Sequence, residues 1–354
     1  MCVTAIDIIE DEILALDEVV LERLLWDHSQ PKMLDEKGEP SLHHHIYWAT
    51  DNYEYLGKGF GFFDEIQIAS ITGEHSRLVR PRAAKDKEEQ DRRTKEKAEV
   101  FTPSWVCNAQ NNLVDEAWFG MPNVFNTEHS DTHTWTPREE HIPFPTKDGK
   151  TWQDYVWDKR LEIACGEAPY LVSRYDTTTG EPIVDLKMRI GLLDRKLRVV
   201  SENVTTTGDW ILWAKCAVKS IYGFEWQGDN LLLAREAILY TVKDYYEAFC
   251  RDVIGKERAL PIDTFQTLAY IISWNIFQMD GIEFTLPMSG CKQDLAIKQQ
   301  TVSLFDAFDE PTEKVDISPI ERQKVYAKVA EWQKKGEANR KEQEFRQPFI
   351  NHKR

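Results

Sequence analysis

Three apolar segments, each followed by a small or acidic residue, constrain the fold of this chain more than any other feature. They occupy residues 161–165, 219–225 and 275–281, and a helical run at 231–235 follows the second of them. Apolar strands that alternate with helical periods are typical of a parallel sheet covered by helices. The sequence therefore predicts an α/β fold with a doubly wound, Rossmann-like sheet within residues 155–290.

The residues at the ends of these segments predict a ligand site. Gly166 follows the first segment, Glu225 ends the second and Asp280 ends the third. The carboxyl ends of parallel strands meet at one edge of the sheet, which is where doubly wound folds bind ligands. At that edge Glu225 can accept hydrogen bonds from ribose hydroxyls, and Asp280 can receive the amino group of an adenine ring.

The turn around Gly166 adds to this prediction. Pro169 is placed to begin a helix, whose free amides and partial positive charge favour a ligand at the turn. Glycine permits close backbone approach, and Glu162 or Glu167 can accept a hydrogen bond from an amine. An ordinary strand-to-helix turn explains the same residues when they are taken alone.

The rest of the chain divides into an N-terminal and a C-terminal part. Residues 1–90 predict an α+β extension, with an amphipathic helix over 6–24 and short strands between 42 and 73. We expect residues 91–300 to form the core domain and residues 301–354 to form a polar, helical, basic tail. The charged stretch 77–99 favours an exposed helix or linker, with a phosphate-contacting surface as the alternative.

Composition limits the partners. The chain has 44 Lys and Arg against 60 Asp and Glu, a net charge of -16, so its overall field repels nucleic acid and anionic membranes. A DNA partner therefore requires a local basic surface or a second subunit.

No apolar stretch approaches the roughly 18–20 residues that span a bilayer, and the acidic start of the chain does not resemble a signal peptide. We expect a cytoplasmic protein with no membrane partner, whose six scattered cysteines are free thiols.

The histidines do not predict a metal site. His129, His133 and His141 lie in a stretch, 126–152, whose Thr and Pro content predicts a long loop rather than a helix that would align two imidazoles. Three consecutive histidines at 43–45 alternate around a strand and cannot all face one ion.

Together these motifs resemble the S-adenosylmethionine-dependent N6-adenine DNA methyltransferases, the modification subunits of restriction-modification systems. The resemblance covers about residues 92–287 and implies a methyltransferase sheet, S-adenosylmethionine as cofactor and double-stranded DNA as substrate. It implies a cofactor-binding role for a Phe-Thr-Pro element, a glycine loop and two strand ends. These residues are Phe101, Thr102, Pro103, Glu162, Cys165, Gly166, Glu167, Ala168, Tyr170, Glu225, Trp226, Asp280 and Gly281.

Three departures from the family pattern shape the functional hypothesis. Ala168 stands where the loop has its second glycine. The stretch from Gly166 to Glu225 is longer than a plain βαβ unit needs, which predicts an insertion within 175–204 with a hairpin at 177–180. No Asn-Pro-Pro-Tyr element, which holds the flipped adenine in the family, follows Asp280. The catalytic residues therefore stay unassigned, and we expect a partner chain, such as a restriction or specificity subunit, to supply the target-base pocket and to contact DNA.

Two other classes of protein remain open at this point. One is a non-catalytic S-adenosylmethionine-binding or scaffold protein of a restriction system, which Ala168 and the absent tetrapeptide favour. The other is an enzyme with a dinucleotide cofactor, although the loop lacks the Gly-x-Gly-x-x-Gly pattern. In all three cases we expect a core built from the residues Ile163, Leu171, Ile221, Phe224, Leu232, Ile272 and Phe277, with Trp213 and Trp274 near the sheet.

Overall fold

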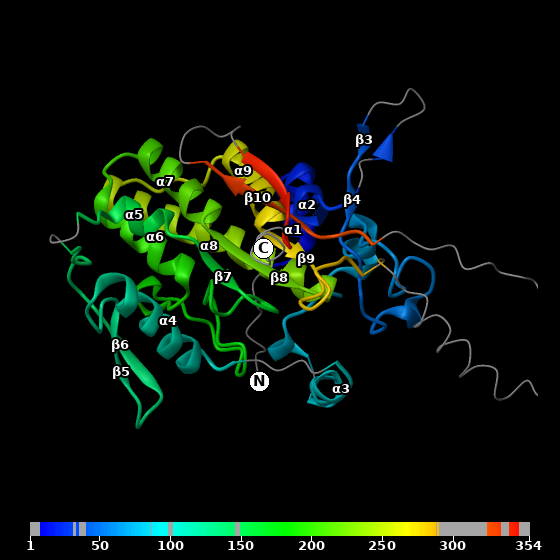
Figure 1. Ribbon diagram of the computed structural model, residues 1–354, viewed down its shortest axis with the longest axis horizontal. Coiled ribbons are helices and arrows are strands. Elements are labelled where there is room, and N and C mark those ends of the chain that lie inside the picture. Colours follow the sequence, from blue (N-terminus) through cyan, green and yellow to red (C-terminus); the bar gives the residue numbers. More distant parts are fainter. Residues whose placement is uncertain are drawn as a thin grey trace, which may run out of the picture.

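The computed structural model describes residues 8–30, 33–34, 40–85, 87–97, 102–145, 149–287, 289, 324–333 and 340–346. It is a mixed α/β protein in which helices surround small sheets (Figure 1). The helices are α1 (Glu10–Leu16), α2 (Glu18–Leu25), α3 (Lys87–Lys97), α4 (Ser104–Phe119), α5 (Trp152–Trp157), α6 (Leu192–Asn203), α7 (Thr207–Lys219), α8 (Gly228–Phe249) and α9 (Ile262–Asn275). The strands are β1 (Trp26–Asp27), β2 (Met33–Leu34), β3 (Pro40–Leu42), β4 (His44–His45), β5 (Asn126–His129), β6 (Thr134–Pro137), β7 (Arg160–Glu162), β8 (Ile221–Glu225), β9 (Ile276–Gln278), β10 (Lys328–Trp332) and β11 (Arg340–Glu344).

The three predicted strands form one parallel sheet, in the order β7-β8-β9. Within the described residues this sheet has three strands. Because side chains alternate between the faces of a strand, Phe224, Phe277 and Met279 share one face, where they pack with Ala327 and Val329. The helix α8 contacts β8 and β9 from the side of the main core. The sheet is thus a short central layer between helices and a C-terminal hairpin.

That C-terminal hairpin corrects the predicted helical tail. In the described part of residues 301–354, β10 pairs antiparallel with β11 over five residue pairs, from Lys328↔Glu344 to Trp332↔Arg340. Val329 and Trp332, which lie within the predicted helical tail, are buried in this hairpin. The physical reason is tertiary: the hydroxyl of Tyr222 on β8 donates to the carbonyl of Ala330 at 3.0 Å, and the apolar face of the sheet needs this cover.

Buried polar contacts attach α4 to the core. Arg195 on α6 donates to Asp115 at 2.6 Å and to Asn108 at 2.9 Å, and Tyr155 donates to Asp115 at 2.9 Å. All four side chains are almost fully buried. Since buried polar groups are costly unless paired, these bonds hold α4 in one orientation. The predicted Thr102-Pro103 element directly precedes this helix.

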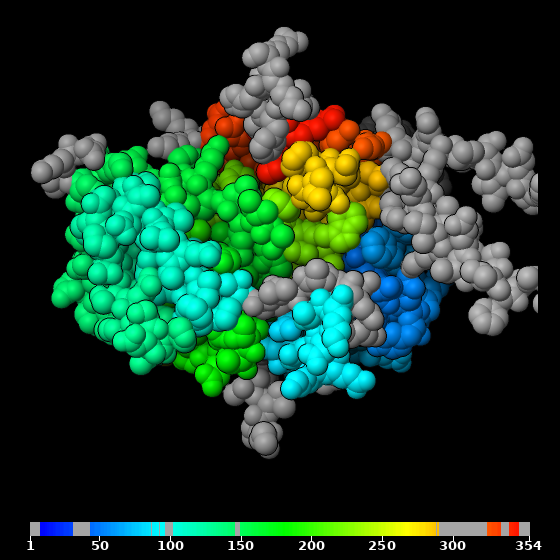
Figure 2. All heavy atoms as spheres, turned by 60° about the horizontal axis from the view of Figure 1, so that its bottom comes forward, coloured from blue at the N-terminus to red at the C-terminus, as the bar shows by residue number. Residues whose placement is uncertain are grey.

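The N-terminal extension is less regular than predicted. The amphipathic segment forms two helices, because the carboxylate of Asp17 accepts from Val20 N at 3.0 Å and so begins α2. Between residues 42 and 73 the expected strands reduce to β3, β4 and one bridge, Tyr47↔Glu65, with short 3₁₀ turns elsewhere. The charged stretch does contain a helix, α3, which lies on the surface between the N-terminal and central segments (Figure 2).

The predicted long loop at 126–152 contains a projecting hairpin. There β5 pairs antiparallel with β6. The carboxylate of Asp154 and the hydroxyl of Thr151 then form a reciprocal cap that begins α5. The expectation of an unbroken loop was wrong, because β5 and β6 form four consecutive cross-strand pairs and the capping box begins a helix at Trp152.

The core expectations hold with one exception. Leu171, Ile221, Phe224, Leu232, Ile272, Phe277 and Trp274 are buried and Trp213 packs partly against the core, whereas Ile163 is 71% exposed. Ile163 lies just past the end of β7, where no neighbouring described element covers it. Cys107, Cys165, Cys216 and Cys250 are free thiols, as predicted; Cys2 and Cys291 lie outside the described residues. In the described part of the chain, no helix is long and apolar enough to cross a membrane.

Candidate functional site

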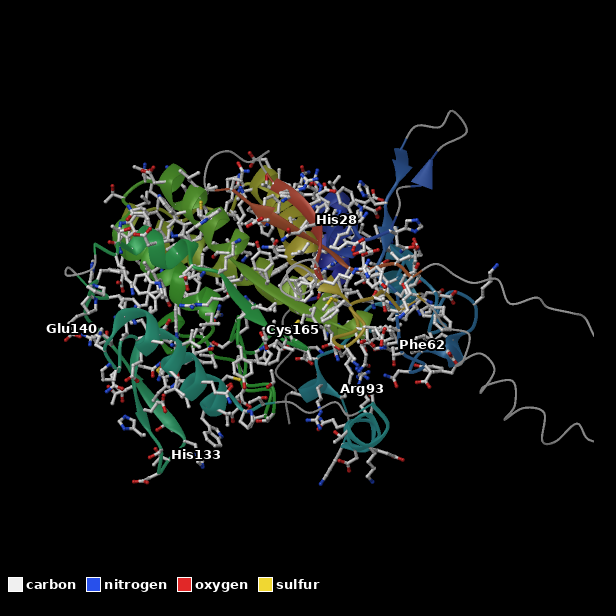
Figure 3. All side chains as sticks on the ribbon, viewed as in Figure 1. His28, Phe62, Arg93, His133, Glu140 and Cys165 are labelled. Carbon is white, nitrogen blue, oxygen red and sulfur yellow. The ribbon has the colours of Figure 1, made fainter. Side chains whose placement is uncertain are left out.

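The predicted glycine loop and the predicted ribose acid meet at the carboxyl edge of the sheet. The amide of Gly166 donates to Oε2 of Glu225 at 2.9 Å, and the amide of Cys165 donates to the carbonyl of Phe224 at 2.8 Å. The second carboxylate oxygen of Glu225 accepts from Gln227 N at 3.1 Å. Two residues far apart in the sequence are therefore in direct contact, and Figure 3 places Cys165 near the middle of the molecule.

The loop has an unusual backbone. Ala164, Gly166 and Ala168 all have positive φ, at 48°, 53° and 60°. The left-handed region suits glycine but costs other residues free energy, and such strain is found most often at functional sites. Gly223 on β8 allows close packing here, since a Cβ on it would lie 3.1 Å from the sulfur of Cys165. The loop therefore curls tightly over the end of β8.

Glu162 organises the chain after the loop. Its buried carboxylate accepts from Tyr170 N at 3.3 Å and from Leu171 N at 3.1 Å. Burial raises the pKa of Glu162 from 4.5 to about 8, while these two backbone hydrogen bonds oppose the shift. Burial also raises the pKa of Glu225, against hydrogen bonds from Gln227 and Gly166. The edge thus contains two desolvated carboxyl groups.

The predicted helix at Pro169 is absent. Residues 169–171 form only turns, and the next α-helix, α6, begins at Leu192. The amides that a helix would leave free are instead partly satisfied by Glu162. The predicted hairpin in the insertion is confirmed by the bridge Tyr175↔Pro182 and by the bond from Gly180 N to Asp176 O at 2.7 Å.

That hairpin connects the Thr102-Pro103 element to the loop. Ser104 N donates to Asp176 at 2.9 Å, and the hydroxyl of Thr177 donates to the carbonyl of Thr102 at 3.0 Å. Burial opposes ionisation of Asp176, but hydrogen bonds from Thr178 and Ser104 outweigh it and lower the pKa. Burial raises the pKa of Tyr170, and the nearby side chain of Thr102 opposes that shift. Thr102, Pro103 and Tyr170 therefore lie together beside the loop, whereas Phe101 lies outside the described residues.

Glu167 faces the N-terminal extension. Its carboxylate accepts from Arg82 N at 2.7 Å and from the hydroxyl of Tyr175 at 2.5 Å. Glu167 is 3% exposed, so these bonds hold the loop against the segment before α3. The carboxylate of Glu167 therefore has a structural role. Ala168, the next residue, is fully buried.

The third strand end is arranged differently from the prediction. The strand β9 ends at Gln278, and Asp280 lies in the following turn, where its carboxylate accepts from Ile282 N and Glu283 N, each at 2.7 Å. Among the described residues, no hydrogen bond or ion pair joins Asp280 to Glu225 or to the glycine loop. Gly281 is exposed in the same turn, where a Cβ would lie 3.2 Å from the ring of Phe224. Asp280 therefore stabilises a turn at the edge of the site.

Sequence reasoning missed the contribution of the N-terminal extension to this edge. The side chain of Gln278 exchanges two hydrogen bonds of 2.8 Å with the backbone of Tyr47 and donates to the carbonyl of Trp226 at 2.7 Å. Trp226 is half-buried, with its ring 6.4 Å from that of Phe62. A polar Gln inside an apolar strand is a signal of such a partner, because a buried amide must be hydrogen-bonded.

The histidines that we considered for metal binding are engaged separately. His45 contacts Glu22 and the carbonyl of Ile66, His44 contacts Glu65, and His133 stacks on Trp105 at 4.0 Å. Within the described ranges, no group of three or more His, Cys, Asp or Glu residues is placed to hold a metal ion.

Comparisons with known proteins contribute no relative. No protein-family model, curated protein or solved structure matches the chain.

Proposed function

We propose that this chain is the S-adenosylmethionine-binding subunit of an adenine-specific DNA methyltransferase of a restriction-modification system. The observation that carries the proposal is the hydrogen bond from Gly166 N to Glu225, which brings the two principal sequence motifs together at the carboxyl edge of a parallel sheet. The edge of such a sheet is the usual place for an adenosine-containing ligand. In this proposal the three-stranded parallel sheet is the cofactor-binding part of a doubly wound, Rossmann-like methyltransferase fold.

The donor and acceptor groups at this edge fit the proposed cofactor. Glu225 offers a carboxylate for ribose hydroxyls, and Gly166 offers a backbone without a side chain beside it. Thr102, Pro103 and Tyr170, which lie together, would flank the methionine end, and Trp226 and the turn at Asp280 and Gly281 would flank the adenine. The bound cofactor would supply a methyl group, and the protein's contribution to the transfer would be positioning.

A partner chain completes the proposal. With a net charge of -16 the chain is poorly suited to grip DNA alone, because affinity for DNA comes largely from cationic contacts with phosphates. A restriction or specificity subunit would supply basic surface and the target-base pocket. The complex would act in the cytoplasm.

A non-catalytic binding or scaffold protein is the second candidate. This candidate is favoured because two of the acids make hydrogen bonds within the protein. Glu225 is hydrogen-bonded to the loop, and Asp280 is hydrogen-bonded to its own turn. In this alternative the site binds S-adenosylmethionine without transferring the methyl group. Methylation of adenine in DNA by the purified chain alone would exclude it.

Calorimetric titration of the purified chain with S-adenosylmethionine, S-adenosylhomocysteine and a dinucleotide tests the cofactor. We expect binding of the first two and none of the third. Glu225→Gln retains an acceptor for Gly166 but removes the charge, so affinity should fall about tenfold or more. Glu331→Gln, at an exposed carboxylate on β10, is the matched control and should bind as the wild type does. Equal affinity in both variants would remove the site assignment.

A further inference from the structure

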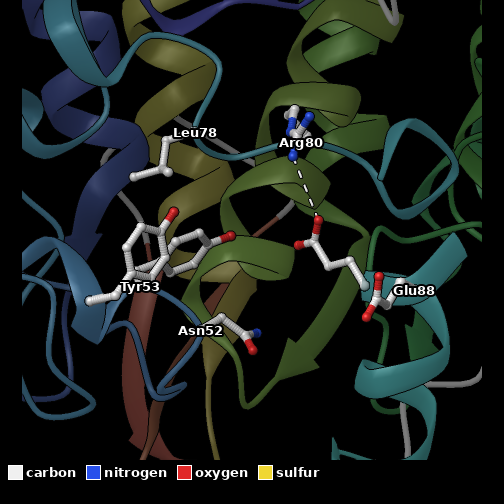
Figure 4. A pocket seen from close by; sticks show the side chains of 7 residues that line it. Asn52, Tyr53, Leu78, Arg80 and Glu88 are labelled. Carbon is white, nitrogen blue, oxygen red and sulfur yellow. Dashed lines mark ion pairs between the residues drawn. The ribbon is translucent and has the colours of Figure 1, made fainter. Parts of the chain in front are cut away.

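A separate cavity lies within the N-terminal extension and beside α3 (Figure 4). It has a volume of about 320 Å³, at the lower end of the range for small-ligand sites, and its walls include Asn52, Tyr53, Tyr55, Leu78, Arg80 and Glu88. In Figure 4, Tyr53 and Leu78 lie on one side of the cavity and Arg80 and Glu88 on the other. None of these residues belongs to the proposed cofactor site.

The two tyrosines differ in how firmly they are held. The ring of Tyr53 packs on Trp48 at 4.6 Å, and its hydroxyl donates to the buried carboxylate of Asp229 at 2.9 Å. Tyr53 is therefore a fixed aromatic wall. Tyr55 is 77% exposed, so its ring is an accessible second surface. A planar ligand can therefore stack on the ring of Tyr55, while Tyr53, which is 4% exposed, is a fixed wall of the cavity.

The polar groups of the cavity are a carboxamide and carboxylates. Within the described residues, Nδ2 of Asn52 is buried and has no hydrogen-bond partner, so rotation of this amide toward a ligand breaks no bond made by that donor. Glu88 is exposed at the rim. Among the described residues that line the cavity, Arg80 is the one cation, and it faces Glu89 at 3.6 Å. The site therefore offers adjacent donor and acceptor groups, with a surplus of negative charge.

We propose that this cavity binds an adenine-type nucleobase. The amide of Asn matches the N6 donor and N7 acceptor of adenine with two hydrogen bonds. A carboxylate at the rim can accept from an exocyclic amino group, and an exposed tyrosine ring can stack on a base. Because Glu88 and Glu89 line the cavity and would repel a negatively charged nucleotide, uncharged adenosine is the appropriate probe. The inference goes beyond the proposed function and does not depend on it.

Titration of the full chain with adenosine, followed by tyrosine and tryptophan fluorescence or calorimetry, tests the site. We expect saturable binding of adenosine and at least about tenfold weaker binding of thymidine, which lacks an exocyclic amino group. Tyr55→Ala, at an exposed side chain that the fold does not need, should weaken adenosine binding about tenfold. Tyr55→Phe retains the ring and should bind as the wild type does.

Two further variants locate the bound nucleoside. Asn52→Leu should abolish the preference for adenosine over thymidine, with circular dichroism and thermal unfolding used to verify that the variant is folded. Glu331→Gln, at a carboxylate on β10 outside both sites, should leave adenosine binding unchanged. If adenosine does not bind, or if Tyr55→Ala leaves its affinity and Asn52→Leu its preference over thymidine unchanged, the assignment of this cavity is overturned. The result for the proposed cofactor site is read separately, from S-adenosylmethionine.

Discussion

The guanidinium of Arg93 lies 3.0 Å from Oδ2 of Asp229, and both side chains are completely buried. Arg93 belongs to α3, whose composition predicts a solvated helix, and Asp229 lies in the first turn of α8. Burial alone would raise the pKa of Asp229, but the cations Arg93 and Lys85 outweigh it and lower the pKa. This pair therefore attaches the charged surface helix to the end of β8, near the candidate site.

Removal of Arg93 should destabilise the protein strongly. In Arg93→Met the carboxylate of Asp229 loses its closest cation while it stays buried, which costs about 3 kcal/mol or more. Urea unfolding followed by circular dichroism measures this change. Lys159→Met, which removes the exposed partner of Glu331, is the control and should change the free energy of unfolding by less than about 1 kcal/mol. Similar values for both variants would show that the buried pair does not anchor α3.

Relief of backbone strain in the loop should stabilise the protein. Ala164 has φ 48° and is exposed, so Ala164→Gly removes the steric cost of the left-handed conformation without loss of buried surface. We expect the free energy of unfolding to rise by about 1 kcal/mol. Ala248→Gly, within α8, should lower it by about 1 kcal/mol, because glycine is unfavourable in a helix. If both substitutions change the free energy of unfolding in the same direction, the backbone of the loop is not strained.

Stability should depend on pH through Glu162. Below about pH 4.5 its carboxyl is protonated in both the folded and the unfolded chain, so it adds no pH dependence. Between that pH and about 8 it ionises only in the unfolded chain, which lowers the free energy of unfolding as the pH rises. Above about pH 8 the effect is constant.

The variant Glu162→Gln isolates this contribution. Gln has a single oxygen, so it keeps an acceptor for only one of these two amides at the present geometry, a loss that does not depend on pH, and it cannot ionise. Between pH 4.5 and 8, the stability of the variant relative to the wild type should increase, by up to about 4 kcal/mol. Urea unfolding at pH 5, 6.5 and 8 measures it, and a constant difference across these values would show that Glu162 is not desolvated.

The thiols should differ in reactivity. Burial is the main reason that the pKa of Cys165 is raised, and nearby Glu162 and Glu225 raise it further. Burial also raises the pKa of Cys216, but this thiol is only partly buried and Lys219 opposes the shift. Because the thiolate is the reactive form, iodoacetamide should label Cys216 in the native protein well before Cys165. Peptide mass spectrometry gives the order, and early labelling of Cys165 would mean that the loop is open.

Much of the central sheet could be predicted from local pattern. The strands β8 and β9 and the start of α8 lie where apolar runs and helical periods indicate, because these segments are buried by their own hydrophobicity. The strand β7 overlaps the predicted run 161–165 only at its start, and its Leu161 is exposed. The contact of Gly166 with Glu225 follows from parallel pairing of their strands. The helix at Pro169 could not be excluded from sequence, since the carboxylate of Glu162, which binds the amides there, acts through a fold not yet formed.

The C-terminal hairpin and the buried contacts of the N-terminal extension could not be predicted from local pattern. Val329 and Trp332 fit a thin helical stripe equally well, and only the apolar face of the sheet under them selects the strand. Likewise, the composition of α3 is that of a solvated helix, and the burial of Arg93 depends on Asp229, a residue far along the chain. Local propensities are weak compared with the free energy of covering an apolar surface or pairing a buried charge.

By itself, the amino-acid sequence determined the parallel strands, the acids and glycine at their ends, and the absence of a helical metal motif among the histidines, because these depend on residue type and short-range spacing. Only the tertiary structure decided where the acids lie relative to one another and that the carboxylate of Asp280 stabilises a turn. It also decided that the N-terminal extension lines both the edge of the sheet and the cavity beside α3. These features depend on contacts between distant segments, whose burial and hydrogen bonding exist only after the chain has folded.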